Sequence, residues 1–259
     1  MTALLTAEFR KVVTLRFWWV LGLVPLIVGM FSSTITLPAM SVSTNALEVD
    51  PLHVDLAATL YGLGVALFLL VLFAALFGAV NVGTEFRYKT LTTTFLTARG
   101  RDGVIGAKLA VTAGFGILYG LAVEAVSVAL LLTFGGESFG LSGTLFAMLG
   151  TALICAALWA LLGGGISMLT RSWVVSCIAI AVWFTVGELI LRAILSGIGL
   201  GSVNGFLPVS ATLGTVANAA ASNEIDWLTL WPAAPLTLLA WTVAFVAGGW
   251  VLMRQRDIN

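Results

Sequence analysis

Three charged side chains fall inside long apolar stretches of this sequence, where an ionisable group is costly and is a candidate for function. Glu188 and Arg192 are four residues apart with the acid first, which favours an ion pair on one helix that stabilises the outer interface. Glu124 has no opposite charge three or four residues away, so it must face a cavity, pair with another helix or be protonated. Lining a substrate path and making a purely structural contact are equal alternatives for Glu124.

The sequence contains no recognisable catalytic or metal-binding motif. A phosphate loop of the form G-x-x-x-x-G-K-[ST], an H-E-x-x-H zinc motif and a G-x-S-x-G nucleophile motif are all missing. Cys155 and Cys177 lie in apolar stretches, and His53, the single histidine, is a poor metal site without further ligands. The glycine triplet 163–165 indicates close helix packing or a kink. We therefore expect a chain that is not an enzyme and binds no metal or cofactor itself.

The elements that must position these side chains are membrane-spanning helices. Hydrophobic residues make up 60% of the 259 residues and charged residues only 9%, which is too little polar surface to coat a soluble globule. A transmembrane helix needs about 20 apolar residues. Six stretches are long enough, at 17–40, 57–81, 109–134, 145–169, 173–195 and 231–253. We expect an all-α integral membrane protein that forms a single six-span domain over residues 1–259.

The distribution of positive charge predicts the orientation of these spans, because Lys and Arg are retained on the cytoplasmic side. All of the 12 Lys and Arg residues except Arg192 lie on one side of the membrane in this topology: Arg10, Lys11, Arg16, Arg87, Lys89, Arg99, Arg101, Lys108, Arg171, Arg254 and Arg256. The opposite loops carry acidic residues and no Lys or Arg. Both termini are therefore predicted to be cytoplasmic.

Residues 1–16 can form an amphipathic helix before the first span. One side carries the apolar side chains Leu5, Phe9, Val12 and Val13. The other side carries the polar side chains Glu8, Arg10, Lys11 and Thr14. Such a helix lies in the inner membrane interface. The alternative is a basic tail that only sets the topology, which would explain the charges but not the apolar side.

The inner loop 82–107, between the second and third spans, carries the densest group of charges. It contains a short segment, 89–98, that can be helical, with Leu91, Phe95 and Leu96 on one face and threonines over the rest. We favour a surface that docks onto a cytoplasmic partner. A loop whose charges only set the topology is the alternative, but topology does not require an apolar stripe.

The sequence of this loop has a specific resemblance. It reads Glu85-Phe86-Arg87-Tyr88-Lys89-Thr90-Leu91, then Thr93-Thr94-Phe95-Leu96, Arg99-Gly100-Arg101 and Ala107-Lys108. This run resembles the cytoplasmic segment of ABC-2 type transporter permeases, which is approximately E-x-R-x-G-T, a Leu-rich stretch, a Pro, an Arg and an A-K at the third span. Five positions match directly: Glu85, Arg87, Thr90, Arg101 and Lys108. Lys89 stands where Gly is usual, and Ala98 stands where Pro is common.

The resemblance implies a membrane subunit of an ATP-binding cassette exporter. Such a subunit lies in the cell membrane, which in a bacterium is the cytoplasmic membrane. Such a subunit moves a lipophilic or amphipathic compound and acts with a separate ATPase, which binds ATP and Mg²⁺. The partners that the resemblance implies also include a second permease chain, either identical or different, and the surrounding membrane lipids. Nucleic acid is not among the implied partners. In this family a coupling helix in the loop docks into a groove of the ATPase. The residues assigned to coupling here are Glu85, Arg87, Tyr88, Lys89, Thr90, Leu91, Phe95, Arg99, Arg101 and Lys108.

The outer segment 196–230 is rich in glycine and apolar residues. The resemblance implies short re-entrant helices here, before the sixth span, and a plain extracellular loop is the alternative because glycines weaken a helix. Two other functions also remain open for the whole chain. One is an ATP-independent carrier or channel that uses Glu124 and the Glu188–Arg192 pair, and the other is a membrane anchor for a cytoplasmic enzyme.

Overall fold

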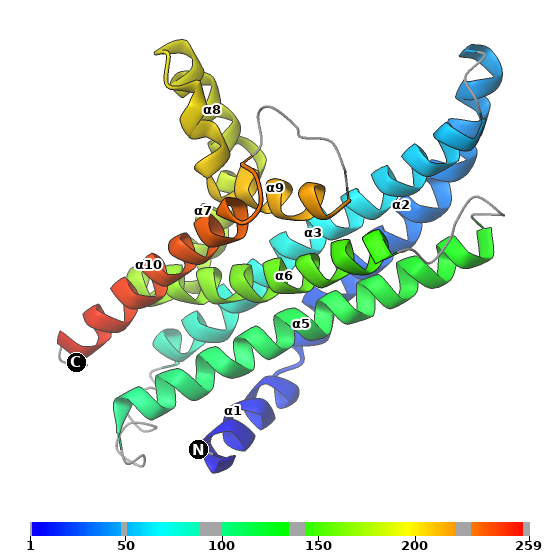
Figure 1. Ribbon diagram of the computed structural model, residues 1–259. Coiled ribbons are helices and arrows are strands. Elements are labelled where there is room, and N and C mark those ends of the chain that lie inside the picture. The colour runs from blue at the N-terminus through cyan, green and yellow to red at the C-terminus, as the bar shows by residue number, and fades with distance from the viewer. Residues whose placement is uncertain (1, 48–50, 89–99, 135–142, 221–228, 256–259) are drawn as a thin grey trace.

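The computed structural model describes residues 2–47, 51–88, 100–134, 143–220 and 229–255. In chain order their elements are α1 (Thr2–Thr14), α2 (Phe17–Leu47), α3 (Pro51–Arg87), α5 (Arg101–Phe134), α6 (Gly143–Thr170), α7 (Trp173–Val182), the π-helix η2 (Trp183–Gly187), α8 (Glu188–Gly197), the 3-10 helix η3 (Gly201–Phe206), α9 (Pro208–Ala220) and α10 (Ala233–Gln255) (Figure 1). No strand occurs in these ranges. The predicted all-α fold is confirmed.

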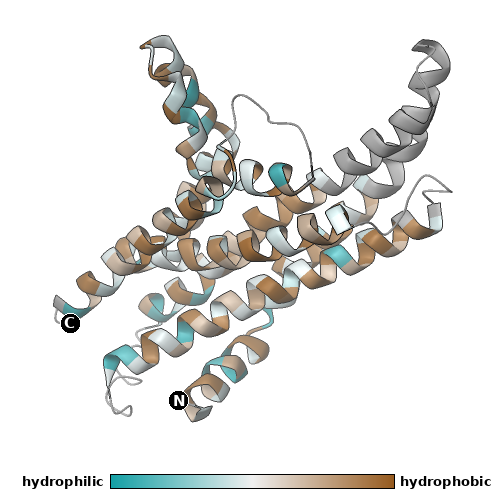
Figure 2. Cartoon of the chain, viewed as in Figure 1, coloured by the Kyte–Doolittle hydropathy of each residue, from teal (hydrophilic) through white to brown (hydrophobic). Residues whose placement is uncertain are grey.

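The long helices have the length and composition of membrane spans. Five described segments meet this requirement, at 64–87, 101–130, 143–170, 173–197 and 233–254, and α1 with the start of α2 forms a sixth candidate bent by 69°. Hydrophobic residues run along α5, α6 and α10, and hydrophilic residues gather at the beginning of α5 beside the N-terminal helix (Figure 2). The chain is therefore a multi-pass membrane protein.

The inner loop is shorter than the sequence predicted. Residues 82–87 continue α3 and residues 101–107 begin α5, because helical hydrogen bonding carries both helices past the apolar core into the interface. The predicted loop 82–107 is thus helical at both ends. Its centre, residues 89–99 with most of the predicted coupling helix, lies outside the described residues.

Helix α6 packs against α3 so closely that their backbones touch. A Cβ atom placed on Gly163 would lie 2.0 Å from the carbonyl oxygen of Ala75, and one placed on Gly78 would lie 1.9 Å from that of Ala160. No side chain larger than hydrogen fits at either position, and small residues of this kind allow close helix packing in membranes. The prediction that the triplet 163–165 serves packing is confirmed.

The described part of the outer segment is folded into the bundle. Helix α9 contacts α6 and α10, and Leu207, Val209 and Ala211 are buried. Trp159, near the middle of α6, donates from Nε1 to Oγ1 of Thr212 at 2.8 Å, so the beginning of α9 lies at the depth of mid-α6. Residues 201–220 are therefore helical and packed against the bundle, which agrees with the short helices that the resemblance implied. Their re-entrant position in the membrane stays a prediction.

Candidate functional site

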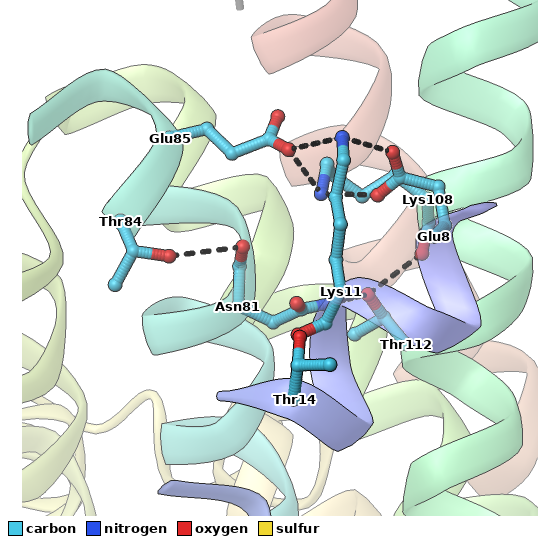
Figure 3. A network of polar contacts seen from close by, with 8 residues as sticks. All are labelled: Glu8, Lys11, Thr14, Asn81, Thr84, Glu85, Lys108 and Thr112. Atoms are coloured by element: carbon cyan, nitrogen blue, oxygen red, sulfur yellow. Dashed lines mark hydrogen bonds and ion pairs between the residues drawn. The ribbon is translucent and has the colours of Figure 1, made fainter. Parts of the chain in front are cut away.

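Four charged side chains from three helices meet at the end of the bundle where α3 ends and α5 begins (Figure 3). Lys108 of α5 lies 2.6 Å from a carboxylate oxygen of Glu8 in α1 and 2.9 Å from one of Glu85 in α3. Lys11 of α1 lies 2.5 Å from Glu8 and 3.1 Å from Glu85. The two acids and two bases alternate around a closed ring with no net charge. We call these four residues the charge cluster.

The charge cluster is buried, so its electrostatic interactions are strong. Glu8, Glu85 and Lys108 are 3%, 6% and 4% exposed, whereas Lys11 is more accessible. Burial alone would raise the pKa of the Glu8 carboxyl, but the charges and hydrogen bonds of Lys108 and Lys11 outweigh it and hold this pKa below its ordinary value. Burial would likewise lower the pKa of Lys11, yet Glu8 and Glu85 raise it overall. Glu8 and Lys11 are therefore both charged at physiological pH.

The face of α1 that packs against the bundle is not the face that its apolar residues predicted. The buried residues of α1 are Glu8 and Val12, which face α5, while Leu5, Phe9 and Val13 are exposed. An exposed apolar side suits a helix in the membrane interface, where it meets lipid. Glu8 lies on the polar side of α1, as predicted, but it is buried there because Lys11 of α1 and Lys108 of α5 pair with its carboxylate and compensate the burial.

A second polar contact joins α3 and α5 one turn deeper in the membrane. Asn81 donates from Nδ2 to Oγ1 of Thr112 at 2.9 Å, and Thr112 donates to the carbonyl oxygen of Lys108 at 2.8 Å. Both side chains are buried. Sequence reasoning missed this contact and the roles of Glu8 and Lys11. The three-residue spacing of Glu8 and Lys11 was visible, but their partners are 74 to 100 residues away.

The structure separates the predicted coupling residues into two groups. Glu85 and Lys108 point into the charge cluster. Arg87 and Tyr88 are exposed at the end of α3, and the Arg87 guanidinium lies 5.7 Å from the ring centre of Trp173. Arg101 is exposed at the start of α5. The other predicted coupling residues lie outside the described residues: Lys89, Thr90, Leu91, Phe95 and Arg99.

Glu188 has partners that its spacing to Arg192 did not indicate. It is buried, and its carboxylate accepts hydrogen bonds from the backbone N–H of Val209 at 2.7 Å, and from the N–H and hydroxyl of Ser210 at 2.6 and 2.7 Å. Val209 and Ser210 are the second and third residues of α9, whose first N–H groups have no partner within the helix. Glu188 thus caps α9 from another helix, and its charge suits the positive end of the helix dipole.

Glu124 is buried in α5, as its position in the sequence predicted. Its Oε1 has no hydrogen-bond partner among the described residues, and neither has the hydroxyl of Ser127 one turn further. A buried polar atom without a partner costs free energy and calls for an explanation. The structural contact and the substrate-path role therefore both stay predictions.

Comparison with known proteins agrees with this arrangement. The family model described as "ABC-2 family transporter protein" matches residues 4–188, well over half of the chain. The match includes the whole charge cluster and both ends of the inner loop. A search of curated proteins found no match. The chain belongs to the ABC-2 family of transporter proteins and is a membrane permease of an ABC-type transporter.

Proposed function

We propose that this chain is the permease subunit of an exporter driven by ATP hydrolysis in a separate ATP-binding cassette subunit. One observation carries the proposal. The charge cluster ties α1, α3 and α5 together at the base of the inner loop, with Glu85 before the loop and Lys108 after it. Because separating a buried ion pair is costly, a force that a bound ATPase applies to the loop is passed to three helices at once.

The surface that meets the ATPase consists of the exposed end of α3 and the following loop. Arg87 and Tyr88 are exposed there, and Arg and Tyr are among the residues that contribute most to protein interfaces. The apolar face of the loop, Leu91 and Phe95, would fill a groove on the partner. Glu85 and Lys108 contribute indirectly, because they transmit the movement through the charge cluster.

The working unit contains two permease chains and two ATPase subunits, because six spans enclose a pore poorly. ATP and Mg²⁺ bind to the ATPase, and this chain binds no cofactor. The substrate is a lipophilic or amphipathic compound that crosses the cytoplasmic membrane of a bacterial cell, where lipids surround the bundle.

Replacing Leu91 by Asp is expected to reduce recovery of the ATPase with the tagged permease at least tenfold. A charge at the centre of an apolar contact costs about 2 kcal/mol or more at such interfaces. The measurement is affinity purification from the native host, with mass spectrometry to identify a co-purifying protein that carries a G-x-x-x-x-G-K-[ST] phosphate loop. The mass of the detergent-extracted complex gives the number of permease chains.

Thr93→Asp provides a matched control, since it adds the same charge to the opposite face of the predicted coupling helix. We expect it to leave recovery of the ATPase unchanged. The amount of permease inserted in the membrane must be equal in both variants. Equal recovery of the ATPase with the two variants, or no protein with a phosphate loop, would contradict the proposed docking surface.

A second candidate function is supported by the unpartnered carboxyl oxygen of Glu124. An intramembrane acid of this kind can couple transport to protons in an ATP-independent carrier. Glu124→Gln keeps the shape and the hydrogen-bonding capacity of the side chain but removes the ionisable proton. If Glu124 lines the path, we expect altered preference between two substrates of different charge, assayed in vesicles with and without ATP. An equal fall for both substrates that follows lost protein would indicate a structural contact instead.

A further inference from the structure

A cavity of about 250 Å³ lies between α3, α6, η2 and α9. Leu67 and Phe68 of α3 form one side, Met148 of α6 forms another, and Phe184 of η2 and Val216 of α9 complete it. Helix α9 packs beside α6 (Figure 1), and its residues form one wall of this space. The cavity therefore exists only because α9 packs against the bundle.

The walls of the cavity offer no free hydrogen-bonding group among the residues that line it. Thr212 supplies the one hydroxyl, which donates to the carbonyl oxygen of Pro208 at 2.8 Å and accepts from Nε1 of Trp159 at 2.8 Å. The other lining side chains are aliphatic or aromatic, or are methionine. A charged or polar ligand would lose its hydration there without compensation, so the cavity selects uncharged apolar groups.

The size of the cavity is sufficient for a hydrocarbon. Apolar cavities of about 150 Å³ stay dry and bind benzene, so a larger cavity of the same chemistry accommodates a longer group. Two aromatic contacts define its shape at one end. The centroid of the Phe184 ring lies 4.9 Å from the centroid of the Phe68 ring and 4.7 Å from that of the Trp159 ring, and both pairs are in edge-to-face arrangements.

The wall formed by α9 is held in place by a polar contact outside the cavity. Glu188 follows η2 directly and binds the amino end of α9, while Phe184 of η2 and Val209 of α9 both line the cavity. A π-helix shifts the direction of the side chains that follow it. The same short segment thus supplies both an apolar wall residue and the carboxylate that positions the opposing wall.

We propose that this cavity binds an alkyl chain, and that Glu188 positions its α9 wall. The alkyl chain is part of either an exported lipophilic compound or a membrane lipid, and only the first of these two sources rests on the proposed function. Binding itself requires neither the ATPase nor ATP.

A cavity-filling variant tests the proposal. Gly64 lines the cavity, and a Cβ atom placed on it meets nothing within 4 Å, so the side chain of Gly64→Leu enters open space. Gly114→Leu is the matched control, because Gly114 also has open space around it but lies on the exposed surface of α5. Ala217→Leu fills the cavity from the α9 side and serves as a second variant if Gly64→Leu does not fold.

The measurement is photolabelling of the purified protein in lipid nanodiscs, with adducts mapped by mass spectrometry. Two probes are used separately: a twelve-carbon alcohol with a terminal diazirine, and a phosphatidylcholine with a diazirine at the end of one acyl chain. We expect adducts on Met148 or Val216 that fall at least fivefold in the filled variants, remain in Gly114→Leu and are displaced by unlabelled dodecanol. Labelling by the alcohol indicates cargo-like binding, and labelling by the phospholipid alone indicates a resident lipid.

Two results would overturn the proposal. One is labelling confined to exposed apolar residues such as Ile178 and Val182. The other is labelling of the cavity wall that the filled variants leave unchanged, provided that these variants melt at the same temperature as Gly114→Leu. The assay contains no ATPase, so failure of the proposed ATPase docking does not affect its outcome.

Discussion

Replacing Lys108 by methionine will lower the stability of the folded chain by about 3 kcal/mol or more, because removal of one partner leaves a buried charge uncompensated. Lys108 pairs with both Glu8 and Glu85, and its side chain is 5% exposed. Methionine keeps the length and the apolar character of the lysine stem, so the loss reports the charge alone. The measurement is the midpoint of thermal unfolding of the purified protein.

Release of α1 is the structural result expected in Lys108→Met. A Cβ atom placed on Gly103 lies 3.6 Å from a methyl carbon of Leu4, so α1 rests on α5 at this point, and a short bismaleimide can join Leu4→Cys to Gly103→Cys. The native Cys155 and Cys177 are first replaced by alanine. We expect rapid cross-linking in the parent and slow cross-linking in Lys108→Met. Equal rates would show that the charge cluster does not hold α1.

Arg254→Met is the matched control for this prediction. Arg254 pairs with Asp102 at the same end of the bundle, but the two side chains are 57% and 50% exposed. Exposed ion pairs contribute little because water and salt screen them. We therefore expect Arg254→Met to leave the midpoint of unfolding almost unchanged.

The double variant Glu8→Gln with Lys108→Met extends the same test. It leaves Lys11 and Glu85 as a balanced pair 3.1 Å apart, so the loss of stability should be smaller than the sum of the two single losses. Additive losses would mean that the four charges act independently and do not form one cluster.

Replacing Glu188 by alanine will release the amino end of α9 from the bundle. Three hydrogen bonds disappear, and two backbone N–H groups and a hydroxyl lose their partner inside the membrane. Each buried group left without a partner costs about 1 to 3 kcal/mol. Because water is absent from the bilayer core, the chain can avoid this cost only by moving α9 outward.

Cysteine accessibility measures this movement. Ala211 of α9 is fully buried, so Ala211→Cys in the cysteine-free background should resist a membrane-impermeant maleimide added from outside. We expect rapid modification after Glu188→Ala and slower modification after Glu188→Gln, whose amide oxygen still accepts hydrogen bonds. Leu189→Ala, at an exposed neighbouring position, should leave Ala211→Cys protected. Continued protection in Glu188→Ala would show that α9 does not depend on Glu188.

Hydropathy alone was sufficient to predict the long apolar helices of the chain. A span requires about 20 apolar residues wherever it packs, and this local property placed six stretches that all coincide with observed helices or, for 173–195, with α7, η2 and α8. The inner loop also carried enough of the family pattern to predict membership correctly. The end of α3 and the beginning of α5 were misplaced, because helical hydrogen bonding continues where hydropathy falls.

The partners of the buried charges were decided by the tertiary structure. The residue types of Glu85 and Lys108 do not show whether their partner is an ATPase or Glu8. Only the packing of α1 against α5 brings a carboxylate oxygen of Glu8 to 2.6 Å from Lys108. In the same way, the carboxylate of Glu188 caps α9 because the fold brings the beginning of α9 beside it. Sequence spacing describes neighbours on one helix, whereas desolvated charges are stabilised by whichever partners the fold brings to them.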